Sequence, residues 1–317
     1  MKNIIKVLSV LFAIGFTAIS CNDNTQDEPV MSQTIYAIAS RDANLSSLKA
    51  AIDKAGLATT LDGTGTFTVF APSNAAFTTF LQANGFATLN DVPVAALKEI
   101  LLNHVLAARV TSSEITTGYV STLAKGAASS TRNLSMFINK TTGVKINGTV
   151  NVTTADILAT NGVIHKTDAV IGLPTIVTHA LANPNFTSLV AALTRSDMPN
   201  FVGILGGTAS SPFTVFAPTN AAFTSLLTEL GLANLAAIPT ATLENLLKYH
   251  VVAGANVAST DLTNNMSVTT FQGGMFTITT TGGAKIKDAN NRTANIILTD
   301  VQCSNGIVHA IDKVLLP

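Results

Sequence analysis

The chain has 317 residues, of which 47% are hydrophobic and 11% charged, and its formal net charge is zero. A chain of this length usually folds as about two domains of roughly 150 residues. No basic patch exceeds two adjacent residues, so the sequence lacks the electrostatic footprint of a nucleic-acid-binding protein. So few charges are more typical of exported adhesive or structural proteins than of cytosolic enzymes.

The first twenty residues are predicted to be a lipoprotein signal peptide. Two lysines are followed by a short apolar run and then by small residues directly ahead of Cys21. The apolar run is shorter than the about 20 residues that a membrane-spanning helix needs. The segment "AISC" resembles a bacterial lipoprotein box, in which the cysteine is acylated after cleavage. We therefore predict Cys21 as the lipidation site, with plain secretion as the alternative.

Residues 21–31 are predicted to be an acidic tether. They are polar, contain a proline, and include Asp23, Asp27 and Glu28. In some bacterial groups, acidic residues after the lipidated cysteine mark lipoproteins for the outer face of the outer membrane. We therefore expect a cell-envelope protein that a lipid anchors to the outer membrane and that is exposed at the cell surface. The periplasmic leaflet is the alternative location.

The remainder of the chain contains two copies of one domain. The stretch "FTVFAPSNAAFT" at residues 67–78 returns as "FTVFAPTNAAFT" at residues 213–224, and the one change is Ser73 to Thr219. Segments before and after this stretch also recur in the same order. For example, "NGVIHKTDAVIGLP" at the end of the first copy returns as "NGIVHAIDKVLLP" at the end of the second. This self-similarity predicts a duplicated domain, with copies at residues 32–174 and 175–317 and almost no linker.

Each copy begins with a helical pattern and a short strand. The segment "NLSSLKAAIDKAGL" has apolar residues at helical spacing, which predicts a helix. The next segment, "FTVFA", alternates and predicts a strand with Phe67, Val69 and Ala71 on one face. Ser73 and Thr219 then follow a proline and precede a second helical pattern, where each is predicted to be a helix N-cap.

The later half of each copy is strand-like. Further helices are predicted after Pro93 and Pro239, followed by alternating segments that are typical of strands. The Asn-Gly pairs at residues 161–162 and 305–306 predict turns before the closing strands. Helices in the first half and strands in the second predict an α+β fold.

Taken in this order, the motifs resemble those of the fasciclin-like domain family. "FTVFAPTNAAF" matches the first family signature, "LLKYHVV" at residues 246–252 its Tyr-His motif, and "NGIVHAIDKVLLP" its second signature. The first copy departs from the Tyr-His motif, because Asn103 stands where the second copy has Tyr249. The resemblance implies two tandem domains, each a wedge-shaped β-sandwich flanked by helices. It also implies a surface-anchored, non-enzymatic protein that serves adhesion or extracellular interaction.

The resemblance also indicates candidate partner contacts. In animal members of the family, an Asp-Ile segment ahead of the second signature and the Tyr-His region have been proposed as receptor contacts. The partner that this implies is a protein, a matrix component or a glycan. The matching residues of this chain are Asp156, Ile157, Asp300, Val301, Tyr249 and His250.

The sequence contains no motif of a catalytic or metal site. HExxH, CxxC, GxSxG and the phosphate-binding GxxxxGK[ST] are all absent, so we expect no catalytic residue, metal or cofactor. A hydrolase would need a nucleophile and a base that the motifs do not supply. The stronger alternative function is a periplasm-facing binding module for a small molecule or polysaccharide, with a concave pocket.

The paired histidines are predicted to belong to a structural polar core. Each lies in an apolar stretch, where a buried imidazole needs hydrogen-bond partners, and Asn74 and Asn220 are the predicted partners. The unpaired Cys303 is predicted to be a small buried residue rather than a reactive thiol. The residues predicted for this polar core are Asn74, Asn220, His104, His165 and His309.

Overall fold

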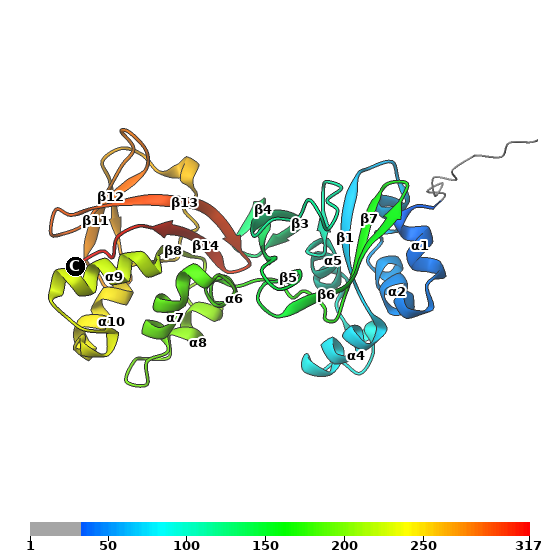
Figure 1. The fold of residues 1–317 in the computed structure, drawn as a ribbon, viewed down its shortest axis with the longest axis horizontal. Coiled ribbons are helices and arrows are strands. Elements are labelled where there is room, and N and C mark those ends of the chain that lie inside the picture. Colours follow the sequence, from blue (N-terminus) through cyan, green and yellow to red (C-terminus); the bar gives the residue numbers. More distant parts are fainter. Residues whose placement is uncertain (1–32) are drawn as a thin grey trace, which may run out of the picture. The chain divides into compact units, whose positions relative to one another are not determined.

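Each half of the chain forms helices first and then strands, as the sequence predicts (Figure 1). The structure is a computed structural model that describes residues 33–317. The predicted signal peptide, Cys21 and the predicted tether lie outside the described residues. Below, residues 33–174 are called the first domain and residues 175–317 the second domain.

The first domain has helices and strands in the following order along the chain. They are α1 (Ile35–Arg41), η1 (Ala43–Leu45), α2 (Ser46–Lys54), α3 (Ala58–Asp62), β1 (Phe67–Pro72), α4 (Asn74–Ala83), η2 (Leu89–Asp91), α5 (Val94–Leu102), β2 (Val105–Leu106), β3 (Gly118–Gly126), β4 (Ser129–Asn139), β5 (Lys145–Ile146), β6 (Val150–Ala159) and β7 (Gly162–Thr167).

The second domain repeats this order with small differences in its short helices. Its elements are α6 (Ile176–Ala182), η3 (Pro184–Phe186), α7 (Thr187–Leu193), α8 (Phe201–Gly206), β8 (Phe213–Pro218), α9 (Asn220–Leu230), η4 (Leu235–Ala237), α10 (Thr240–Tyr249), β9 (Val251–Ala253), η5 (Ser259–Asp261), β10 (Met266–Thr269), β11 (Met275–Thr279), β12 (Lys285–Lys287), β13 (Thr293–Cys303) and β14 (Gly306–Ile311).

Both domains have the same sheet topology. The first domain has a seven-stranded sheet in the order β2-β1-β7-β6-β5-β4-β3, and the second has a seven-stranded sheet in the equivalent order β9-β8-β14-β13-β12-β11-β10. The repeated strand is parallel to the closing strand, β1 to β7 and β8 to β14, whereas the other neighbouring strands are antiparallel. The predicted α+β class is therefore confirmed.

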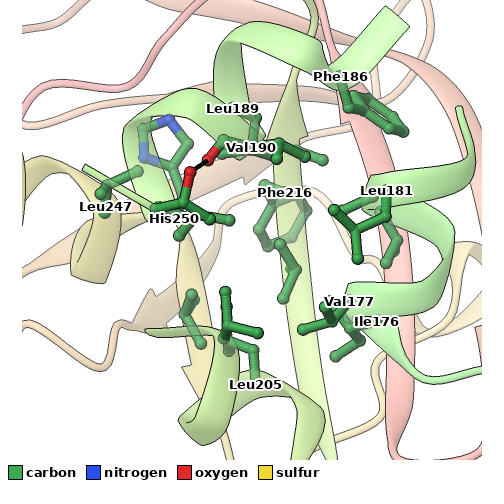
Figure 2. Close-up of a pocket in the computed structure, with 18 residues that line it drawn as sticks. Ile176, Val177, Leu181, Phe186, Leu189, Val190, Leu205, Phe216, Leu247 and His250 are labelled. Carbon is green, nitrogen blue, oxygen red and sulfur yellow. Dashed lines mark hydrogen bonds between the residues drawn. The ribbon is translucent and has the colours of Figure 1, made fainter. Parts of the chain in front are cut away.

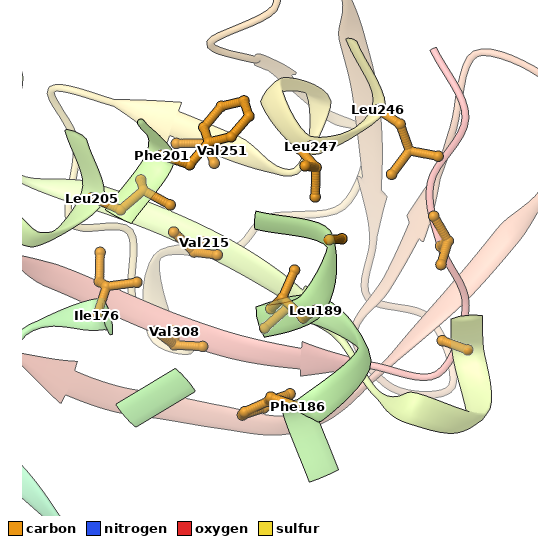
Figure 3. Packing of buried hydrophobic residues seen from close by; sticks show 14 of the residues in the cluster. Ile176, Phe186, Leu189, Phe201, Leu205, Val215, Leu246, Leu247, Val251 and Val308 are labelled. Carbon is orange, nitrogen blue, oxygen red and sulfur yellow. The ribbon is translucent and has the colours of Figure 1, made fainter. Parts of the chain in front are cut away.

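The repeated strand is buried on both faces, which explains why its sequence is so apolar. In β1, Val69 and Ala71 pack in a hydrophobic cluster with the helices, whereas Phe70 packs in a second cluster against the other strands. In β8, Val215 and Phe216 divide between two clusters in the same way. Successive side chains of a strand point to opposite faces, so the predicted alternation is confirmed. Figure 3 shows the helix-side cluster of the second domain around Val215, Leu189 and Val308.

The two predicted N-caps are confirmed. The Ser73 hydroxyl accepts a hydrogen bond of 3.2 Å from the backbone N–H of Ala76, and the Thr219 hydroxyl accepts one of 3.4 Å from Ala222. Each satisfies one of the free N–H groups at the start of a helix, α4 or α9. The single difference between the two copies of the motif therefore keeps the cap.

Candidate functional site

An aspartate occupies a bulge at the same place in both domains. Asp156 in β6 and Asp300 in β13 have positive φ angles of 61° and 60°. The pairing of β6 with β7 and of β13 with β14 shifts its register beside these residues. A bulge of this kind redirects a side chain out of the regular strand pattern. Each aspartate is thus turned away from the regular ladder and toward a neighbouring loop.

The carboxylate of each aspartate binds a serine, which is Ser112 in the loop after β2 or Ser259 at the start of η5. Asp156 accepts a hydrogen bond of 2.7 Å from the backbone N–H of Ser112 and a second bond from the Ser112 hydroxyl. Asp300 accepts a bond of 2.8 Å from the backbone N–H of Ser259 and a second from its hydroxyl. The hydrogen bonds from Ser112 hold the pKa of Asp156 below its ordinary value, so this carboxylate is ionised at neutral pH.

A buried histidine holds the backbone of each bulge in place. The backbone N–H of Asp156 donates to His165 Nδ1 at 3.2 Å, and His165 Nε2 donates to the carbonyl of Val110 at 2.9 Å. His309 makes the equivalent bonds to Asp300 and to the carbonyl of Val257. Because Nδ1 accepts from a backbone N–H, the ring proton is on Nε2. Both ring nitrogens are satisfied, so these two histidines shape the bulge.

The other histidine pair connects a helix end to the last segment of each domain. His104 Nδ1 bonds to the carbonyl of Ile100 at 2.7 Å, and His104 Nε2 accepts from Ile171 N–H at 2.9 Å. His250 bonds to Leu246 and Leu315 at the same distances. Burial lowers the pKa of both histidines to about 4, so both rings are neutral at pH 7.

Comparison with known proteins identifies the family to which these two domains belong. The fasciclin domain model matches residues 43–174 and 184–317. The chain belongs to the fasciclin family. The matches begin at Ala43 and Pro184, whereas the predicted domains begin at residues 32 and 175. The helices that precede the matches, α1 and α6, contact helices of their own domain.

The relatives share either one fasciclin domain or both. An uncharacterized protein of Synechocystis sp. is 36% identical over 144 residues, which are 45% of this chain and 98% of that protein. Human periostin is 29% identical over 276 residues, which are 84% of this chain and 30% of periostin. A solved FAS1 domain pair from the insect cell adhesion molecule Fasciclin I has a TM-score of 0.52 at 22% identity, and the match covers 86% of this chain and 97% of that chain. The predicted family and the predicted tandem fasciclin fold are therefore confirmed.

Three of the predicted contact residues are buried inside the second fasciclin domain, which corrects the prediction. The exposed fractions are 0% for Tyr249, 3% for His250 and 2% for Val301. The Tyr249 hydroxyl donates to the carbonyl of Met275 at 2.6 Å and accepts from Ala289 N–H at 3.2 Å. These side chains have internal partners and are not available to a ligand at the surface. Their roles in this fold are structural.

The asparagines of the repeated motif do not reach the histidines, which corrects a second prediction. Asn74 accepts from Ser47 N–H at 2.9 Å and donates to the carbonyl of Ala43 at 2.8 Å, and Asn220 makes the equivalent bonds. Each asparagine therefore ties the start of one helix to the start of another. The ring nitrogens of the histidines form hydrogen bonds with backbone groups instead. All the predicted polar-core residues therefore make structural contacts, but in separate networks.

The two bulges differ in what covers them. In the first fasciclin domain, the Asp156 side chain is 39% exposed and Leu158 is 38% exposed. In the second, Arg132 from the first domain lies 4.0 Å from Asp300 and donates to Thr260 at 2.8 Å. Gln302, which corresponds to Leu158, is only 2% exposed. Other parts of the chain thus cover the second bulge in part and leave the Asp300 side chain 27% exposed, whereas the first bulge is more open.

A polar pocket of about 400 Å³ lies where Arg132 approaches Asp300. The backbone N–H of Gln302 donates to the Ser135 hydroxyl at 3.0 Å, which joins β13 to β4 across this pocket. The pocket is therefore part of the contact between the two fasciclin domains. Its lining residues are Ser121, Thr131, Arg132, Asn133, Ser135, Asp300 and Gln302.

Sequence reasoning missed the residues that hold and cover the bulges. Ser112 and Ser259 occupy matching positions in "TSSE" and "ASTD", so a closer alignment of the two copies could have found them. Arg132 has no such signal, because its partner Asp300 is remote in the sequence.

The described part of the chain shows neither a metal site nor a membrane-spanning helix. Within residues 33–317, no three His, Cys, Asp or Glu side chains gather closely enough to hold a metal ion. None of the helices in that range is both long and apolar enough to cross a bilayer. Cys303 is buried as predicted, and burial raises the pKa of its thiol, which keeps it protonated and unreactive.

Proposed function

We propose that this chain is a non-enzymatic adhesion or extracellular interaction protein, and that it binds a protein, matrix or glycan partner through the first fasciclin domain. Fasciclin domains are known for adhesion and extracellular interaction, and Fasciclin I is a cell adhesion molecule. The proposed contact, called the Asp156 surface below, consists of Lys140, Asp156 and Leu158. Ile157, which the sequence also predicts as a contact, packs against the helix-side hydrophobic cluster instead.

The observation that carries this proposal is the difference between the two bulges. Asp300 and Gln302 line the same pocket, so the matching residues Asp156 and Leu158 face one common side. In the second domain that side is partly covered by Arg132 and Ser135, whereas in the first domain it is more exposed. An exposed leucine beside a carboxylate held in a fixed position offers both apolar and charged contacts.

The Asp156 surface is also rigid, which favours binding. Lys140 Nζ donates to the carbonyl of Ser112 at 2.7 Å, and Ser112 in turn donates to Asp156. His165 fixes the backbone at Asp156 from below. Contact residues that are already held in place lose less conformational freedom when a partner binds.

For the whole protein, we propose attachment to the outer membrane through a lipid on Cys21, with the fasciclin domains exposed at the cell surface. The support is the sequence pattern of residues 1–31. Protease added to intact cells should degrade the protein. Complete protection would instead favour the alternative of a periplasm-facing binding module for a small molecule or polysaccharide.

Substitution of Leu158 by lysine should reduce attachment of cells to a surface or matrix by at least tenfold. The change places a charge in the apolar part of the Asp156 surface, and it should leave the fold intact because Leu158 is already partly exposed. The measurement is attachment of a deletion strain that is complemented with wild-type or variant protein.

Val94→Lys is the matched control, since Val94 is 50% exposed and lies at the start of α5. Attachment should be unchanged in this control. Equal attachment with Leu158→Lys and wild type would rule out the Asp156 surface. Attachment that persists without the whole protein would overturn the proposed function itself.

A further inference from the structure

The second domain contains an apolar pocket that is separate from the Asp156 surface. It lies between α6, α7 and α8 and the sheet, with a volume of about 40 Å³ (Figure 2). Val177, Val190 and Leu205 form part of its wall. Leu181 is 62% exposed and Val202 is 37% exposed, so these two wall residues reach the surface. Exposed aliphatic side chains that cluster often mark an interaction site, whereas isolated ones do not.

The polar side chains in the wall, His250 and Thr194, have no free hydrogen-bond donor to offer a ligand. Both ring nitrogens of His250 are bonded inside the domain, to Leu246 and Leu315. The Thr194 hydroxyl donates to the carbonyl of Val190 at 2.8 Å. A sugar or a peptide backbone would have to leave its own polar groups unpaired here, which costs free energy. The pocket is therefore complementary to an uncharged hydrocarbon.

At the same place in the first domain, polar side chains bond to one another. Because Ile35 N–H bonds to Asn161 and Ile176 N–H bonds to Asn305, α1 and α6 can be aligned residue by residue. The Tyr36 hydroxyl donates to Asp53 at 2.7 Å, and Lys49 pairs with Asp53 at 2.6 Å. In the second domain, Val177 stands in place of Tyr36, Thr194 in place of Asp53 and Val190 in place of Lys49.

Two further positions show the same exchange. Ser40 in α1 corresponds to Leu181, and Asp62, which accepts a hydrogen bond from the Thr34 hydroxyl, corresponds to Gly206. At five equivalent positions, the second domain thus has an aliphatic or smaller residue where the first has a polar one. The exchange replaces the charged residues Lys49, Asp53 and Asp62 with uncharged ones beside the pocket of the second domain.

We propose that this pocket binds the end of an unbranched hydrocarbon chain, such as the acyl chain of a lipid. One water needs about 10–15 Å³ in this measure of volume, so 40 Å³ holds roughly three or four methylene-sized groups. Each methylene that enters should strengthen binding about fourfold. The pocket should not distinguish head groups, because its wall supplies no partner for them.

The test is titration calorimetry of the full chain with decanoate and with decanol. Wild type should bind one molecule of either probe per chain, and the two affinities should agree within about threefold. The variant V177Y/V190K/T194D copies the polar side chains of the first domain and should weaken binding at least tenfold. The reciprocal variant Y36V/K49V/D53T should open the first domain and raise the stoichiometry to two.

Circular dichroism checks that each variant is folded. If V177Y/V190K/T194D does not fold, Leu181→Ser, which copies Ser40, is the second test and should weaken binding at least threefold. The proposal is overturned if wild type binds neither probe, as it would if the occupant were a protein. It is also overturned if it binds decanoate but not decanol, or if folded V177Y/V190K/T194D binds as tightly as wild type.

Discussion

Gly306→Ala is expected to unfold the second domain. A Cβ at this position would lie 2.2 Å from the carbonyl oxygen of Phe213 and 2.9 Å from its backbone nitrogen. These are backbone atoms of the adjacent parallel strand, β8, which cannot move without breaking its pairing with β14. We expect a loss of more than about 4 kcal/mol in the free energy of unfolding, measured by urea denaturation.

Gly172→Ala is the matched control for this substitution. No atom lies within 4 Å of a Cβ at Gly172, and its φ angle is not in the left-handed region. Its stability should therefore equal that of wild type or exceed it slightly, because alanine restricts the unfolded chain. Equal stability of the two variants would contradict the close packing of β8 and β14. Gly162, whose Cβ would lie 1.9 Å from the Phe67 carbonyl, should behave like Gly306.

Acid should destabilise the protein strongly between about pH 6.5 and 4. Burial lowers the pKa of His104 and His250 to about 4 and that of His179 to about 3. An unfolded histidine takes up its proton near pH 6.5, whereas these folded ones do not until pH 4 or below. The unfolded state therefore binds more protons in this window, so stability is full above pH 6.5 and falls as the pH falls.

The loss at acid pH should reach on the order of 3 kcal/mol for each of these three histidines. The measurement is the urea midpoint at several values between pH 7.5 and 4.5, above the range where the lowered pKa values of the aspartates matter. A constant midpoint across this range would contradict the burial of the neutral rings.

His179 provides a control for the acid effect. It lies in α6 against Tyr119, with ring centroids 5.3 Å apart, and neither of its ring nitrogens makes a well-formed hydrogen bond among the described residues, although the Ser135 backbone lies close to the ring. The equivalent residue of the first domain is Ile38. His179→Ile should keep or increase stability at pH 7.5 and reduce the acid slope by about one proton. An unchanged slope would contradict the assignment.

The parts of the fold that depend on local sequence could be predicted. The caps at Ser73 and Thr219 and the alternating faces of β1 follow from neighbouring residues, and the repeat shows that both domains share them. The partners of Asn74 could not be predicted in this way. Its hydrogen bonds go to residues 43 and 47, which only the packing of α2 against α4 brings close.

The candidate site was only partly predictable for a related reason. The family resemblance indicates the positions of Asp156 and Asp300 but not what covers them. Exposure depends on Arg132, which lies far from Asp300 in the sequence and belongs to the other domain. The burial of Tyr249 and His250 likewise follows from packing against the strands and the C-terminal segment. A motif shared by both copies therefore indicates the fold, whereas residues that differ between them decide which surface is free.

The isosteric pair Asp156→Asn and Asp300→Asn tests the central claim most directly. Each removes one charge and keeps an oxygen that can accept from the serine N–H. Because the Asp156 side chain is 39% exposed and that of Asp300, which Arg132 approaches, is 27% exposed, Asp156→Asn should reduce cell attachment severalfold, whereas Asp300→Asn should have a clearly smaller effect. Equal effects of the two substitutions, or a larger effect of Asp300→Asn, would contradict the claim that the Asp156 surface is the partner site.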